Sequence, residues 1–305
     1  MAFSRFPRFK RSANIPAVRL TERDRTIIRL VHQHRFLRSS HIVDLVGDSR
    51  QPLLRRLQLL YHHGYLERPR AQIAYFRNSG SRRMVYGLGK KGAALLKAEV
   101  SVSHGIRWSE KNRSIRRLFF EHVIAVSDFM VALELTCRKR RDVRFVAGHD
   151  LPIPGEAQRR HPFKWHVQLN NHLKLGILPD RVFALDLVNE DGSWNRAFFF
   201  LEVDRGTMPI VRKNLSQSSF YRKLIAYKAT WSRGLHRSKF DFHRFRVLTV
   251  TTSAARVRSL LDACSQLKSG HGLFLFCDQT LLKQHGDILS VPWKTARGET
   301  TSILP

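Results

Sequence analysis

Apolar residues near the start of the chain recur every three or four positions in three successive segments. This spacing predicts amphipathic helices, because an apolar stripe with that period lies on one helical face. The predicted helices cover residues 21–35, 40–46 and 49–62. Thr21 suits the N-cap of the first helix and either Asp48 or Ser49 that of the third, and Gly47 suits a helix end. Two short strands are predicted to follow, over residues 65–68 and 83–88.

A polar loop over residues 69–82 is predicted between the two strands. Three helices followed by a two-stranded hairpin are typical of a winged helix, in which the third helix enters the major groove of DNA. The run YGLGKKGAALL at 86–96 resembles the wing strand and following helix of many bacterial winged-helix proteins. The candidate DNA contacts lie on the predicted third helix and wing: Arg50, Gln51, Arg55, Gln58, Arg77, Arg82 and Arg83. Arg55 and Gln58 are expected to read base edges, whereas the wing arginines hold phosphates.

The pattern changes after residue 114, where a long amphipathic helix is followed by short apolar runs of strand length. The predicted order is a helix at 115–137, strands at 144–153, 177–188 and 196–203, a helix at 216–231 and a strand at 246–251, with a polar stretch over 154–171. This αβββαβ order predicts an α/β fold, α+β over the whole chain. The predicted divisions are a mobile basic arm (1–18), a winged-helix domain (19–100), a linker (101–114) and an α/β domain (115–305).

Carboxylates gather near the ends of the predicted strands of the second domain. Asp180 follows Pro179 at the start of one strand, and Glu202 and Asp204 lie two residues apart on the next, so the side chains of Glu202 and Asp204 share a face. Carboxylates beside apolar strands are costly to bury unless something offsets their charge. A divalent cation does so, and oxygen ligands favour Mg²⁺ or Mn²⁺. The candidate metal ligands are Asp180, Glu202 and, from the preceding helix, Glu121.

The residues PD at 179–180 and EVD at 202–204 resemble the motif of the PD-(D/E)xK nuclease superfamily, which has the restriction-endonuclease-like fold. The resemblance implies that the first two acids hold a metal ion that activates water. Asp204 stands where that superfamily usually has the lysine that positions the water. Lys213 and Lys223 are candidate substitutes from neighbouring elements. The candidate catalytic residues are therefore Asp180, Glu202, Asp204 and Lys223.

A closer resemblance extends over most of the chain. The winged-helix start, the PD at 179–180, FLEVDRGT at 200–207 and KLIAY at 223–227 resemble the replication-relaxation family of plasmids and other mobile elements. In that family ExDRGT is the usual form, so Asp204 is part of the family pattern. The resemblance implies a role in plasmid replication, DNA relaxation or mobilisation.

The charge of the chain points to a polyanionic partner. The 305 residues include 54 Lys and Arg against 24 Asp and Glu, a net charge of +30. So many positive charges repel each other unless a polyanion neutralises them. Double-stranded DNA is such a polyanion, and each phosphate that a lysine or arginine neutralises releases a condensed counterion. No apolar run reaches the roughly 18 residues that a membrane helix needs. Three isolated cysteines are typical of a reducing compartment, so we expect a cytoplasmic protein. The absence of a GxxxxGK[ST] loop predicts no nucleotide cofactor.

Three hypotheses for the function follow from these features. In the first, the winged helix of a replication or mobilisation protein selects DNA and the second domain grips or processes it. In the second, the chain is an endonuclease that depends on Mg²⁺ or Mn²⁺. In the third, it is a transcriptional regulator whose α/β domain mediates assembly only. The carboxylates also have a structural explanation, as an ionic network with Arg205, Arg212 or Lys223. Replication or mobilisation proteins and a second copy of the chain are further candidate partners.

Overall fold

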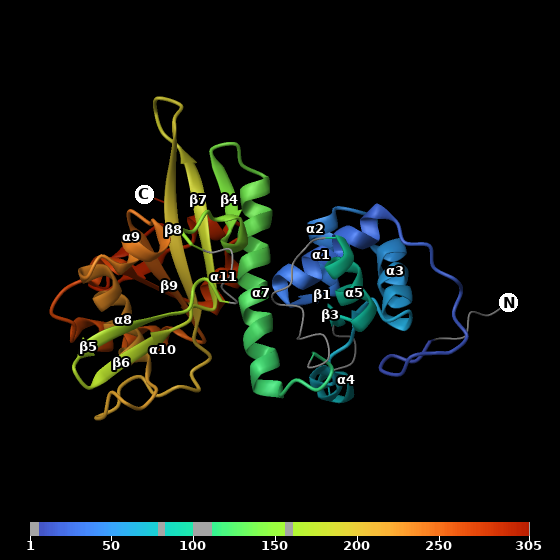
Figure 1. Ribbon diagram of the computed structural model, residues 1–305, viewed down its shortest axis with the longest axis horizontal. Helices are drawn as coiled ribbons and strands as arrows, with labels where there is room; N and C mark the ends of the chain where they lie inside the picture. Colours follow the sequence, from blue (N-terminus) through green and yellow to red (C-terminus); the bar gives the residue numbers. More distant parts are fainter. Residues whose placement is uncertain (1–5, 79–82, 100–111, 156–160, 305) are drawn as a thin grey trace. The chain divides into compact units, whose positions relative to one another are not determined.

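The computed structural model describes residues 6–78, 83–99, 112–155 and 161–304, and the fold is mixed α/β, as predicted (Figure 1). The chain divides into two compact units, Met1–Val131 and Ala132–Pro305. This division falls inside helix α7 (Arg117–Arg138), whereas the sequence pattern assigned the whole helix to the second domain. Most of the predicted linker, 101–114, lies outside the described residues.

The three predicted helices of the first unit are confirmed as α1 (Glu22–His34), α2 (Ser39–Val46) and α3 (Arg50–His62). Local signals set their bounds. Thr21 and Asp24 form a reciprocal capping box at the start of α1, which satisfies backbone N–H groups that the helix leaves unpaired. Gly47 ends α2 in the left-handed conformation, with φ of 74°.

A three-stranded sheet follows the order β1-β3-β2. Its strands are β1 (Phe36–Arg38), β2 (Leu66–Glu67) and β3 (Val85–Leu88), and β1 was not predicted. Gly87 of β3 allows β1 to pair closely, because a Cβ atom at this position would come within 2.6 Å of the Phe36 ring. The first unit therefore has a third strand between its first two helices.

The loop predicted over residues 69–82 is helical over most of its described length. It contains a short 3-10 helix (Arg70–Gln72) and α4 (Ile73–Asn78). The side-chain amide of Gln72 donates to the Val85 carbonyl and accepts from the Val85 N–H, both at 2.9 Å. These two long-range hydrogen bonds hold the 3-10 helix against β3. The helices in this segment could not be predicted from the sequence, because the stretch is short and polar and shows no apolar periodicity. Helix α5 (Lys90–Glu99) follows β3 near the predicted position.

The described part of the N-terminal arm is packed, although the sequence predicted a mobile segment. The Arg11 guanidinium donates to the Tyr61 carbonyl at 3.0 Å and to the Glu67 carboxylate at 2.8 Å. Buried Arg68 donates to the Arg8 carbonyl at 2.7 Å and lies over the Tyr61 ring. These contacts hold the arm against the end of α3 and β2.

The first half of α7 also packs within the first unit. The Phe120 ring meets the Phe36 ring edge to face, with centroids 5.6 Å apart. Arg38 donates to the Asp128 carboxylate at 2.8 Å, and His41 contacts the same carboxylate at 3.1 Å. Burial alone would raise the pKa of Asp128, but hydrogen bonds from His41 and Arg38 lower it to about 2. Asp128 is thus a structural anion in the first unit.

The second unit is built on a seven-stranded sheet of order β12-β11-β10-β9-β8-β7-β4. Its strands are β4 (Val143–Ala147), β7 (Arg181–Val188), β8 (Trp194–Val203), β9 (Phe245–Thr251), β10 (Phe274–Asp278), β11 (Trp293–Thr295) and β12 (Thr300–Thr301). Strands β8, β9 and β10 are parallel, and the other neighbouring pairs are antiparallel. Parallel neighbours need crossovers, which here contain helices. These are α8 (Phe220–Ser232) with α9 (Leu235–Phe240), and α10 (Ala254–Ser265), while the short α11 (Gln279–Gln284) follows β10.

A separate two-stranded sheet, β5 (Trp165–Asn170) and β6 (Leu173–Ile177), is the main departure from the predicted second domain. The sequence pattern treated 154–171 as a polar stretch and merged Ile177 with the next strand. The alternation of buried and exposed positions is clear in the structure, with Val167 and Leu175 fully buried. The alternation extends over only a few residues in each strand, so from the sequence alone these strands cannot be distinguished from a loop.

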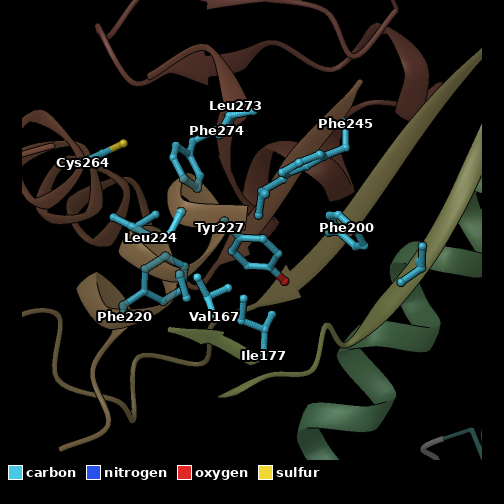
Figure 2. Packing of buried hydrophobic residues seen from close by; sticks show 14 of the residues in the cluster. Val167, Ile177, Phe200, Phe220, Leu224, Tyr227, Phe245, Cys264, Leu273 and Phe274 are labelled. Atoms are coloured by element: carbon cyan, nitrogen blue, oxygen red, sulfur yellow. The ribbon is translucent and has the colours of Figure 1, made fainter. Parts of the chain in front are cut away.

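The core of the second unit lies between the sheet, the β5–β6 pair and helices α8 and α10. Figure 2 shows Tyr227 of α8 among Val167, Ile177 and Phe200. The Trp165 indole N–H donates to the Thr230 hydroxyl at 2.9 Å, so the aromatic side chain is buried with its polar atom satisfied. This packing fixes α8 over the end of β8, where the candidate carboxylates lie.

Candidate functional site

Cations and amides are among the exposed side chains of α3. Arg50, Gln51 and Arg55 are exposed, and Gln58 is partly exposed. The opposite face is buried as predicted, through Leu53, Leu57, Leu60 and Tyr61. Helix α2 and helix α3 are separated by only three residues, 47–49, and the two helices pack together. The candidate contacts on α3 therefore point away from the core of the first unit.

His62, in the last turn of α3, does not belong to the exposed face of the helix. Its side chain is buried, and its Nδ1 accepts a hydrogen bond from the Ser12 N–H at 3.1 Å. Burial lowers the pKa of His62 to about 4, with further repulsion from the charges of Arg68 and Arg11. His62 is neutral at physiological pH and belongs to the packing of the N-terminal arm.

Most other arginines near α3 are paired with acids, which distinguishes them from Arg50 and Arg55. The ion pairs are Arg23–Asp48, Arg25–Glu99, Arg29–Glu22, Arg38–Asp128 and Arg56–Asp24. Helix α3 itself contains no acidic residue, and no ion pair is recorded for Arg50 or Arg55 with any described residue. Their charges are therefore available to an anionic partner.

The predicted wing contacts are only partly described. Arg83 is exposed just before β3. The side chain of Arg77 and the whole of Arg82 lie outside the described residues, so their contribution stays a prediction.

In the second unit, the structure brings Asp180 and Glu202 together on neighbouring strands. Asp180 immediately precedes β7, and its N–H donates to the Leu201 carbonyl of β8 at 3.0 Å. The Asp180 carboxylate accepts from the Val203 N–H at 2.8 Å. Since side chains alternate along a strand, this register places the two carboxylates on the sheet face that α8 covers.

Glu202 is buried and satisfied by two residues of α8. Its Oε2 lies 2.5 Å from Lys223 Nζ, and its Oε1 accepts from the Tyr227 hydroxyl at 2.6 Å. Lys223 and Tyr227 reach the same carboxylate because they are four residues apart on one helical face. The predicted lysine substitute therefore contacts the candidate metal ligand directly.

The electrostatics of this cluster are dominated by burial and by close charges. Burial raises the pKa of Glu202, attraction to Lys223 opposes the shift, and repulsion from Asp180 adds to it. Burial alone would lower the pKa of Lys223, but Glu202 and Asp180 outweigh it, so the Lys223 pKa is raised. Burial and Glu202 raise the pKa of the Tyr227 hydroxyl well above its usual value. Lys223 is the stable cation of the cluster.

Asp204 points to a different set of partners. Its carboxylate accepts from the Arg256 guanidinium at 2.8 and 3.2 Å and from the Thr251 hydroxyl at 2.9 Å. Arg256, in α10, also donates to the Met208 carbonyl at 2.6 Å. Arg256 could not be found from the sequence, because it lies 52 residues from Asp204 and carries no local signal. Asp204 thus joins the end of β8 to α10.

Glu121 lies in the part of α7 that belongs to the first unit, and it pairs with Arg117 at 2.9 Å. Among the described residues, no group of three or more His, Cys, Asp and Glu side chains could hold a metal ion. Glu121 as a metal ligand stays a prediction.

The candidate ligands of a divalent cation in the second unit are the carboxylates of Asp180 and Glu202. Both Glu202 oxygens accept hydrogen bonds, from the Lys223 ammonium group and from the Tyr227 hydroxyl, so an ion bound here would have to displace the ammonium group from Oε2. Mg²⁺ is often held by one or two carboxylates and keeps several waters, so two carboxylates are the minimum that this site offers. A metal ion at this site stays a prediction.

Over the part of the chain that the structure describes, no helix is both long and apolar enough to cross a membrane. A family model described as replication-relaxation matches residues 28–240, well over half of the chain. The matched segment includes α3, Asp180, Glu202 and Lys223, and it ends before Arg256. Comparisons with curated proteins and with solved structures found no match. The chain belongs to the replication-relaxation family.

Proposed function

We propose that this protein binds double-stranded DNA as a replication, relaxation or mobilisation protein of a plasmid or other mobile element. The first unit selects the DNA, and the second unit grips or processes it. Membership of the family supports a role related to replication in such an element. The net charge of +30 supports a polyanionic partner.

The observation that carries the proposal is the exposed cations along α3. Arg50, at the start of the helix, and Arg55, in its middle, are exposed and have no ion pair with any described residue, whereas neighbouring arginines are held in ion pairs. Exposed arginines along a helix without acids form the electrostatic footprint of a DNA-binding element. Arg55 and Gln58 have the side chains that pair with guanine and adenine edges in the major groove.

The arrangement of the surrounding elements supports a winged helix. Helix α2, the turn at Gly47 and helix α3 follow in the order of a helix-turn-helix, in which the second helix is the recognition helix. The strands β2 and β3 and the helical segment between them take the position of the wing. We expect α3 to lie in the major groove and Arg83 to contact the phosphate backbone.

Replacing Arg55 with alanine is expected to weaken binding to a preferred site more than binding to random duplex DNA. If Arg55 contacts a guanine through two hydrogen bonds, the loss of discrimination is about 1–3 kcal/mol. A preferred site is first selected from a random duplex library with the wild-type protein, and fluorescence anisotropy then gives both affinities. Lys97→Ala, at an exposed position of α5, is the control and should keep the discrimination. Equal losses on both DNAs would show that Arg55 does not read bases.

A second candidate function, metal-dependent DNA cleavage, is favoured by one observation. Lys223 places an ammonium group beside Glu202 and within the field of Asp180, although the lysine position of the nuclease motif is occupied by Asp204. Asp180 and Glu202 would hold Mg²⁺ or Mn²⁺, which when bound supplies charge stabilisation and an activated water. Lys223 can hold a phosphate oxygen or a water by donating a hydrogen bond.

Under this second function, Asp180→Asn is expected to abolish metal-dependent nicking of supercoiled plasmid while DNA affinity stays near that of the wild type. The substitution removes the negative charge that a metal ligand needs and keeps the size of the side chain. Reactions contain Mn²⁺, Mg²⁺ or chelator and are compared on agarose gels. Asp150→Asn, at an exposed carboxylate, is the matched control. Intact plasmid in every wild-type reaction would exclude cleavage of this substrate and leave the binding function.

A further inference from the structure

The outer side of the β5–β6 pair carries exposed polar side chains, followed by the exposed Leu178, in a part of the chain without acids. We call this surface the ribbon face and define it by Lys164, His166, Gln168 and Lys174, all of which are exposed. Gln168 and Lys174 lie opposite each other in the antiparallel register, and His166 lies opposite Gly176. Residues that alternate along one strand point to the same side, so these side chains share one face.

The ribbon face is held in position by the apolar side of the same two strands. Val167 and Leu175 are fully buried, and both β5 and β6 pack against α8 (Figure 2). The Trp165 indole is hydrogen-bonded to Thr230 of α8, and the Arg233 guanidinium donates to the Leu169 carbonyl at 3.3 Å. The exposed side chains are therefore presented by a rigid support, which reduces the entropy lost on binding.

The two segments that form the β5–β6 pair and the α8 region contain cations and no acid. Residues 161–178 contain Lys164, Lys174 and three histidines but no Asp or Glu. Residues 205–240, which include α8, contain nine Lys and Arg and again no Asp or Glu. Most of the cations around α3 have acidic neighbours, but the ribbon face has no acid in either segment that builds it. Such a surface attracts an extended polyanion.

Gly176 makes room for the His166 side chain on the ribbon face. The His166 ring lies beside Gly176, where a Cβ atom would be 3.4 Å from the imidazole. The imidazole therefore lies over the glycine and is one of the polar groups of the face.

We propose that the ribbon face binds the phosphodiester backbone of double-stranded DNA, as a second DNA-contacting surface of the chain in addition to α3. This inference rests on the proposed DNA-binding function. Lys164 and Lys174 each neutralise a phosphate, and Gln168 and His166 donate hydrogen bonds to phosphate oxygens. The inner side of the pair is packed on α8, so the outer side makes the contact. Since β6 ends three residues before Asp180, DNA held on the ribbon face is held next to the segment that carries the carboxylate cluster.

The test compares the ribbon variant Lys164→Ala/Lys174→Ala with the control variant Lys268→Ala/Lys283→Ala in the full chain. All four lysines are exposed in the second unit, so both variants remove two charges with little effect on folding. Affinities for the preferred site and for random duplex DNA are measured over a series of salt concentrations. A plot of the logarithm of the DNA association constant against the logarithm of the salt concentration has a negative slope. Each lysine that neutralises a phosphate makes this slope steeper by about 0.9, so the slope of the ribbon variant should be shallower by about 2 than that of the wild type.

The ribbon variant is expected to bind both DNAs about tenfold more weakly at low salt, because phosphate contacts carry no sequence information. The control variant should keep the wild-type slope, and Lys164→Arg/Lys174→Arg should restore it. Equal slopes in the ribbon and control variants, with a wild-type protein that binds DNA, would overturn the inference and leave the proposed function intact. A wild-type protein that binds no duplex DNA would overturn both.

Discussion

Replacing Arg256 with methionine is expected to lower the free energy of unfolding by about 3–5 kcal/mol, as the removal of one partner of a buried ion pair does. The Asp204 side chain is 3% exposed and that of Arg256 17% exposed, so water cannot replace the lost hydrogen bonds. The change also removes the donor to the Met208 carbonyl. Chemical denaturation followed by circular dichroism measures the effect.

Two further variants separate the ion pair from the general effect of losing an arginine. Asp204→Asn/Arg256→Met removes the buried charge as well, so it should be more stable than Arg256→Met alone. Arg258→Met changes an exposed arginine of the same helix and should alter the stability by less than about 0.5 kcal/mol. If Arg256→Met and Arg258→Met have the same free energy of unfolding, the ion pair between Asp204 and Arg256 does not stabilise the fold.

Replacing Lys223 with methionine is expected to destabilise the second unit by about 3 kcal/mol at neutral pH, because it leaves the Glu202 carboxylate buried without its cation. The Glu202 side chain is 2% exposed, and Tyr227 alone remains to donate to it. The length of the methionine side chain preserves most of the packing against β8. Glu202→Gln/Lys223→Met carries no unpaired charge and should recover part of the loss. Lys228→Met, on the same helix, is the matched control.

The destabilisation by Lys223→Met should depend on pH in a defined direction. Burial raises the pKa of Glu202, and the loss of Lys223 removes the charge that opposes this shift. A carboxyl group with a raised pKa in the folded state favours folding at low pH, and that contribution is lost as the pH rises through the folded-state value. The variant should therefore lie closer to the wild type at pH 5 than at pH 8. A difference that does not change with pH would contradict the ion pair as its cause.

These contacts suggest why an acid follows Glu202 where the nuclease motif usually has lysine. In this chain Asp204 anchors the end of β8 to α10 through Arg256. The cation beside Glu202 comes from α8 through Lys223. Lys223 supplies the positive charge next to Glu202, so position 204 does not need a lysine and can carry the acid that binds Arg256.

The features that the sequence determined by itself are those set by residues close together in the chain. The bounds of α1 follow from the capping box of Thr21 and Asp24, and the end of α2 follows from Gly47. The pairing of Lys223 and Tyr227 on one face of α8 follows from their spacing of four. The apolar runs likewise placed Asp180 near the start of one strand and Glu202 near the end of the next. Periodicity and capping act within one or two turns, so the sequence shows them directly.

The tertiary structure alone decided which distant surfaces meet. Strand β1 pairs with β3 because Gly87 has no side chain and the Phe36 ring packs against it. The β5–β6 pair forms because its apolar side packs on α8. The pairing of Asp204 with Arg256 and the burial of His62 under the N-terminal arm depend on segments about 50 residues away. Short strands and polar side chains carry little pattern of their own. Their structure is set by the partner that removes them from water, and the choice of that partner is made only when the whole chain packs.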